Sequence, residues 1–148
     1  IVLFTICALV EFSILLVNDM ALANGVRSAA HFAATSPRAW SNADPVTDTA
    51  TIEGWIQPAT TGIPNNDARI GISYLDGNTG ATCGQYSQAS NAFVGVGGAT
   101  VDTCVVKHNL IQVQANYTYT FLLFPSPTLL NIPYSVVITK TAVIVEEN

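Results

Sequence analysis

The 148-residue chain is 49% hydrophobic and only 10% charged, whereas about 25% of the residues of an average soluble domain are charged. Its formal net charge is −5 and its five Lys and Arg residues are scattered, so no basic patch is present that could neutralise a run of phosphates. These values predict one domain with an appendage, and they argue against nucleic acid as a partner.

The first 35 residues predict one continuous helix. Positions 1–17 are apolar except for Thr5, Glu11 and Ser13, and no proline occurs before Ser36-Pro37. At 1.5 Å per residue the helix would be about 50 Å long, more than a small globular domain can bury. Its apolar start would span roughly 25 Å, slightly less than the ~30 Å hydrocarbon core of a bilayer. We expect this segment to be retained and to hold the protein in a membrane.

Glu11 is the one acidic residue of the apolar segment. A carboxylate at membrane depth is costly and normally has a partner. In one interpretation the carboxyl group is protonated or accepts a hydrogen bond from a nearby hydroxyl, such as that of Thr5 or Ser13. In the other it pairs with a cation of another subunit, for instance a free α-amino terminus.

Small residues recur every four positions in the second half of the helix, at Ala21, Gly25, Ala29 and Ala33. Such a ridge lets two helix backbones approach closely. The ridge could pack on the chain's own head or against identical helices of other copies. The excess length of the helix favours the second alternative, which makes these four residues and Glu11 the candidate subunit interface.

A run of residues along this helix matches a known motif. The chain has Glu11-Phe12 and then Ala21-Leu22-x-Asn24-Gly25-x-Arg27-x-Ala29-Ala30-His31-Phe32-Ala33. This run resembles the TadE-like pilin family of tight-adherence pili, in which a Glu-Phe pair precedes A-L-x-N-A-x-R-x-G-A-R-Y-A at the same spacing. Here Gly, Ala and His stand at positions 25, 29 and 31 in place of Ala, Gly and Arg. The last two predicted strands, with a Pro-containing loop between them and an acidic end, also resemble the C-terminal part of the family.

The resemblance implies a structural, pilin-like subunit that resides in the membrane before assembly. It then polymerises through its N-terminal helix into an extracellular filament, a pilus on the cell surface, with identical subunits as partners. In pilins of this kind a carboxylate near the N-terminus is thought to pair with a neighbour's terminal amine, which implies that role for Glu11. The alternative function is a membrane-anchored minor pilin or a solitary surface-binding domain.

The rest of the chain predicts an antiparallel β-rich head, and the whole an α+β fold with a helix over residues 1–36 and a head over residues 37–148. Alternating apolar residues are typical of half-buried strands. The expected strands cover residues 51–57, 69–75, 105–124 and 134–145. The clearest alternation runs from Ile111 to Leu123, whereas in the last strand Lys140 interrupts the apolar face.

Cys83 and Cys104 bracket a segment rich in Gly, Ser and Ala, and in an exported chain they form the expected disulfide. Cys7 lies in the apolar helix, out of reach of both. The glycine-rich segment favours a surface loop closed by the disulfide rather than a core strand. Asn116-Tyr117-Thr118 is a glycosylation sequon on the polar face of its strand, which makes Asn116 a possible glycosylation site.

No catalytic constellation is visible in the sequence. His31 and His108 are far apart and lack the local patterns of hydrolase or metal motifs. The run Asp76 to Gly80 has two oxygen ligands at calcium-loop spacing, but a tight turn rich in Gly and Asn explains it. We therefore expect no enzyme activity, no cofactor, no metal and no small-molecule substrate.

Overall fold

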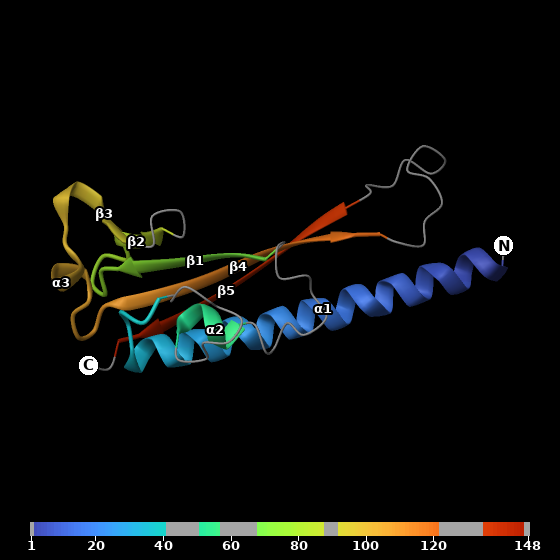
Figure 1. The fold of residues 1–148 in the computed structure, drawn as a ribbon, viewed down its shortest axis with the longest axis horizontal. Coiled ribbons are helices and arrows are strands. Elements are labelled where there is room, and N and C mark those ends of the chain that lie inside the picture. The colour runs from blue at the N-terminus through green and yellow to red at the C-terminus, as the bar shows by residue number, and fades with distance from the viewer. Residues whose placement is uncertain (1, 41–50, 57–67, 88–91, 122–134, 147–148) are drawn as a thin grey trace.

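The computed structural model describes residues 2–40, 51–56, 68–87, 92–121 and 135–146. In these residues a long helix lies along one face of a five-stranded antiparallel sheet (Figure 1). The N-terminal end of the helix lies at one end of the molecule, and the C-terminal end of β5 lies at the opposite end. The expected α+β fold, an apolar N-terminal helix followed by an antiparallel β-rich head, is confirmed.

The strands form one sheet with the order β3-β2-β1-β4-β5, and every neighbouring pair is antiparallel. The elements are α1 (Val2–Thr35), α2 (Ile52–Ile56), β1 (Ala68–Leu75), β2 (Thr82–Ser87), β3 (Ala92–Gly95), η2 (Val96–Gly98), α3 (Val101–Cys104), β4 (Leu110–Thr120) and β5 (Ser135–Val145). Among the described strands, β3 and β5 are the edges of the sheet.

One face of strand β4 is buried in the core. Its inward residues from Ile111 to Tyr119 are buried at every second position, and the residues between them are more accessible. Ile72 of β1 pairs with Val113, and Tyr74 pairs with Ile111, so the buried side chains of β1 continue the same layer. The alternation expected for these two strands is confirmed, because period-two spacing places apolar residues on the face that packs on α1.

Helix α1 covers this face with a stripe of small and branched residues. Leu22, Val26, Ala29 and Ala33 are no more than 1% exposed. Their spacing of four, three and four positions places them on one side of a helix. The same helix contacts α2, β4 and β5. Burial of this stripe therefore ties the second half of α1 to its own head.

The expected strand at residues 51–57 is wrong, because α2 occupies residues 52–56. The Thr51 hydroxyl accepts a hydrogen bond of 3.0 Å from the Gly54 N–H, as in a helix N-cap. Ile52 and Ile56, four residues apart, are both buried, and the Trp55 ring lies 5.7 Å from that of Phe32 in α1. The four-residue spacing of the two isoleucines fits one face of a helix and outweighs the apparent strand pattern.

The expectation of a loop between the two cysteines is also wrong. The segment contains most of β2 and all of β3, η2 and α3, and β2 is an interior strand of the sheet. Gly84 explains the difference, because a Cβ there would lie 2.1 Å from Cζ of Phe93. Glycine at this position lets the aromatic ring of β3 pack over the backbone of β2, so it serves a strand rather than a loop.

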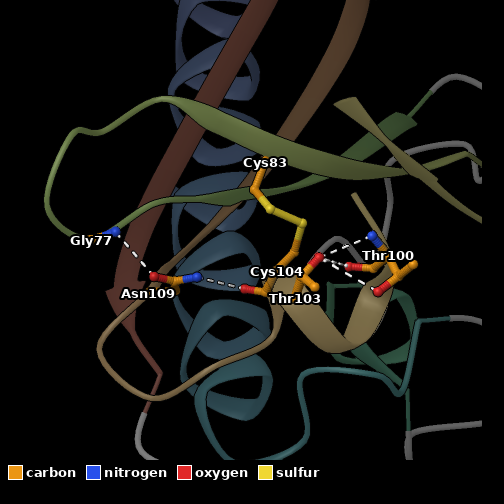
Figure 2. The surroundings of a disulfide bond; sticks show 6 residues. All are labelled: Gly77, Cys83, Thr100, Thr103, Cys104 and Asn109. Atoms are coloured by element: carbon orange, nitrogen blue, oxygen red, sulfur yellow. Dashed lines mark hydrogen bonds between the residues drawn. A yellow bond between two sulfur atoms is a disulfide. The ribbon is translucent and has the colours of Figure 1, made fainter. Parts of the chain in front are cut away.

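Cys83 of β2 and Cys104 of α3 form the expected disulfide, with a Cα–Cα distance of 5.6 Å (Figure 2). The side chain of Asn109 holds the segment between α3 and β4 in place. Its Nδ2 donates to the Cys104 carbonyl at 2.8 Å, and its Oδ1 accepts from the Gly77 N–H at 3.2 Å. The disulfide and this amide together hold α3 against the end of the sheet.

We predict that Ala29→Leu destabilises the protein, because Ala29 is fully buried between α1 and the sheet. Overpacking a filled core costs about 1–3 kcal/mol. Chemical unfolding of the detergent-solubilised chain measures the loss. The matched control is Ser28→Leu, since Ser28 is the adjacent residue of the same helical turn and is exposed. Equal unfolding free energies for the two variants would contradict the assigned packing.

Candidate assembly surface on the N-terminal helix

The side of α1 that faces away from the sheet is apolar along its first twenty residues, apart from Thr5 and Ser13. The exposed large apolar residues there are Val2, Leu3, Ile6, Leu9, Val10, Phe12, Ile14, Leu16, Val17 and Met20. At 3.6 residues per turn they spread over a wide arc centred opposite Glu11, Leu22 and Ala29, with Leu3 and Ile14 at its border. We call these ten residues the outer apolar stripe.

The same side of the helix is polar after Met20. Asn24, Arg27, Ser28 and His31 are exposed there and continue the direction of the outer apolar stripe. Exposed polar residues need no cover, whereas a contiguous apolar surface on a protein in water marks a contact with protein or lipid. The change from apolar to polar side chains between Met20 and Asn24 therefore separates a part of α1 that needs a partner from a part that does not.

Glu11 lies on the inner side of α1 and is only 1% exposed. The Tyr119 hydroxyl of β4 donates a hydrogen bond to Glu11 Oε2. Burial, followed by this contact with Glu11, raises the pKa of Tyr119 above its ordinary value. Of the two interpretations, the structure favours a hydroxyl-bonded carboxyl group, but the hydroxyl comes from the head, since Ser13 donates to the Leu9 carbonyl instead.

The second tie between α1 and the sheet is an ion pair that sequence reasoning missed. Lys140 Nζ of β5 lies 2.7 Å from Asp19 Oδ1 of α1. Lys140 interrupts the inward face of its strand because it meets this carboxylate. The signal was a lone charge on an otherwise apolar strand face, but only the fold shows that Asp19 is the residue opposite to it.

The ridge of small residues faces the chain's own head. Gly25, Ala29 and Ala33 are buried within the single chain, and Ala21 is half-buried. Within the single chain the ridge therefore packs on the chain's own head, the first of the two alternatives. Packing of the ridge against other copies remains a prediction. Small side chains are used here to bring α1 close to the sheet and α2. Together with buried Glu11, these residues are covered in the folded chain.

A shallow apolar groove borders the outer apolar stripe where α1 meets the edge strand β5. It has a volume of about 340 Å³ and is lined by Phe12, Leu15, Leu16, Asp19 and residues 136–139. Val137 is 63% exposed and extends this surface onto the outer face of β5. The apolar surface available for contact is therefore wider than the helix alone.

The remaining predicted residues lie elsewhere on the molecule. Asn116 is half-buried on the sheet face that points away from α1, and its glycosylation remains a prediction. Asp76 accepts hydrogen bonds within its own turn from the backbone of Asn78 and Thr79, which lowers the pKa of its carboxyl group. Within the described part of the chain, no group of three His, Cys, Asp or Glu residues is placed to hold a metal ion.

We predict that Tyr119→Phe destabilises the protein, because it removes a donor from the buried Glu11 carboxyl group. A lost hydrogen bond to a buried polar group costs about 1–3 kcal/mol. Glu11→Gln, which keeps an acceptor oxygen for Tyr119, is the milder control. A double-mutant cycle of Tyr119→Phe with Glu11→Leu should show a coupling energy above about 0.5 kcal/mol. Strict additivity would show that the two side chains do not interact.

Helix α1 is long and apolar enough to cross a membrane: within Thr5–Thr35 an 18-residue stretch has a mean hydropathy of 1.9. A helix of this kind close to the N-terminus can act as a membrane anchor or as a signal sequence. Comparison with protein-family models, with curated proteins and with solved structures finds no match. Fold and surface chemistry are therefore the basis for assigning a function.

Proposed function

We propose that this protein is a pilin-like structural subunit that polymerises through its N-terminal helix into an extracellular filament. The observation that carries the proposal is the outer apolar stripe. Leu3, Leu9 and Val17 are each more than 60% exposed, although the opposite side of the same helix is packed on the sheet. This surface needs lipid before assembly and neighbouring helices after it.

The arrangement suits a contact that leaves each subunit intact. The inner side of α1 is held by Glu11, Asp19 and the buried stripe, so the outer apolar stripe can be covered without separating the helix from its head. A contact between the outer stripe of one copy and the groove beside β5 of the next is head-to-tail. When the rotation between such copies does not close, the product is a helical polymer. The resemblance of residues 11–33 to TadE-like pilins supports the same proposal.

The second candidate function is a head domain that stays anchored in the membrane without polymerising. Lipid covers apolar side chains as well as protein does, and α1 contains a stretch that is apolar enough for a span. The two functions differ in what covers the outer apolar stripe. Shearing of intact cells separates them, since filament subunits are released in sheared material and a solitary anchored domain stays in the detergent-soluble membrane fraction.

We predict that Leu9→Asp abolishes filament formation, because it places a charge in the middle of the outer apolar stripe, where Leu9 is 62% exposed. Burying an unpaired carboxylate at a helix contact costs several kcal/mol. Electron microscopy of sheared material and near-UV circular dichroism of the purified chain measure assembly and folding separately.

Asn24→Asp is the matched control, since it adds the same charge at an exposed position on the polar part of the same helix. It should assemble like the wild type. Filaments of normal length and number from Leu9→Asp would refute the assigned surface. A folded wild-type chain that is released only by detergent, with no filaments on the cells, would instead favour the anchored domain.

A further inference from the structure

A pocket of about 630 Å³ lies at the end of the molecule opposite the N-terminus of α1. Three parts of the chain meet there: the turn that follows α1, the residue after α3, and the residue after β5. The lining residues are Ser36, Pro37, Arg38, Ala39, Val105 and Glu146. Pro37, Ala39 and Val105 give this pocket apolar walls, and Glu146 is its one acidic lining residue.

Glu146 is buried, with only 2% of its surface exposed, and its Oε2 has no hydrogen-bond partner among the described residues. The backbone holds this residue in place, because its N–H donates to the Asn109 carbonyl at 2.8 Å. Burial raises the pKa of the carboxyl group, and the charge of Arg38 opposes this shift. A buried carboxylate oxygen without a donor is costly, so the site favours a group that supplies one.

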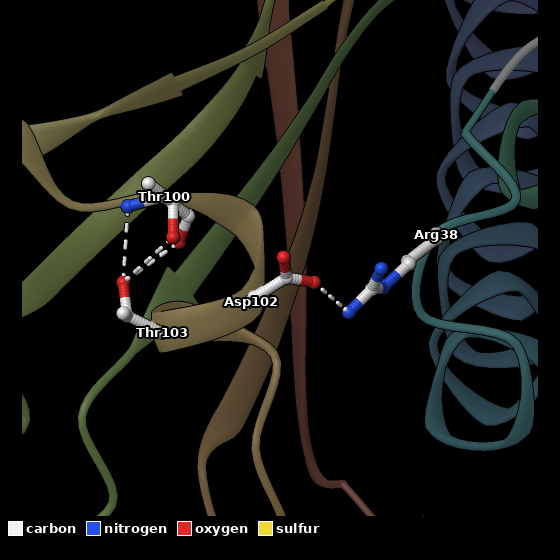
Figure 3. A network of polar contacts seen from close by, with 4 residues as sticks. All are labelled: Arg38, Thr100, Asp102 and Thr103. Atoms are coloured by element: carbon white, nitrogen blue, oxygen red, sulfur yellow. Dashed lines mark hydrogen bonds and ion pairs between the residues drawn. The ribbon is translucent and has the colours of Figure 1, made fainter.

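The Tyr74 hydroxyl and one Arg38 N–H, two donors close to the pocket, are bonded to other groups. The Tyr74 hydroxyl donates to the Pro37 carbonyl and accepts from Trp40 Nε1. Arg38 Nη2 is bonded to Asp102 Oδ1 at 2.5 Å, and Figure 3 shows the guanidinium reaching from the turn after α1 to α3. This pair is exposed on both sides, with side-chain exposures of 54% and 73%. The nearest cation is thus directed toward another carboxylate.

We propose that this pocket binds an alkylammonium group, with the Glu146 carboxylate as its counter-ion. The ammonium supplies N–H donors and a positive charge, and its carbon chain packs on Pro37, Ala39 and Val105. The pocket also lies at the C-terminal end of α1, where the helix dipole favours a cation. This site is separate from the outer apolar stripe and does not depend on filament formation.

Two sources of this chemistry are a free aliphatic amine and a lysine side chain of a second copy. Of the two lysines of the chain, Lys140 is paired with Asp19, whereas Lys107 is exposed in the turn before β4. Lys107→Gln distinguishes the sources. If Lys107 of another copy occupies the pocket, its removal raises the affinity for an added amine, because a competitor is lost. Unchanged affinity assigns the pocket to a free amine.

The test is an NMR titration of the full chain in detergent micelles with n-butylammonium chloride, followed at the amide signals of Val105 and Glu146. We expect saturable shifts in the wild type and a loss of affinity of about tenfold or more in Glu146→Gln, which removes the charge at constant volume. Tetramethylammonium, a cation without N–H donors, should bind more weakly.

Ala39→Leu is the second variant, because it fills the pocket and leaves Glu146 in place. It should also weaken butylammonium binding, and it keeps the test decisive should Glu146→Gln fail to fold. The proposal is overturned by any of three results: no saturable shifts in the wild type, equal binding by the wild type and either variant, or equal binding of tetramethylammonium and butylammonium.

Discussion

The packing of α1 on the inner face of the sheet is the contact on which the rest of the structure depends. Ala29 and Ala33 bring the helix backbone close to β4 and α2, and Leu22 and Val26 fill the space between them. This contact decides which side of the helix is covered and which side is left for other molecules. The division of α1 into an inner and an outer side is therefore a property of the folded chain.

Polar ties extend this packing toward the N-terminus, beyond the region of small residues. Asp19 forms an ion pair with Lys140 of β5, and about two helical turns closer to the N-terminus Glu11 accepts a hydrogen bond from Tyr119 of β4. A buried carboxyl group can bond only where a donor faces it, so these contacts fix the register of the helix on the strands. Glu11 thus has a partner within its own chain, and its pairing with a neighbour's terminal amine remains a prediction.

The long helix and the alternating strands β1, β4 and β5 were predictable from sequence because their periodicities are local and extended. The short elements were not. Ile52 and Ile56 indicate a helix only once α1 is known to lie beneath them, and Gly84 indicates a strand only once Phe93 is known to cover it. The partners of Glu11 and Lys140 lie about 110 to 120 residues away in the sequence, and no local pattern encodes contacts at such separation. The unpartnered Oε2 of Glu146 was also not predictable, since it depends on how the segments that follow α1, α3 and β5 meet.

The change from Met20 to Asn24 on the outer side of α1 has a geometric consequence. The two residues are about 6 Å apart along the helix axis. Whatever material surrounds the apolar part must therefore end within about one helical turn, because beyond this level it would desolvate Asn24 and Arg27. The sequence of the helix therefore limits how deeply each molecule can be inserted, and this limit is the same in lipid and among neighbouring subunits.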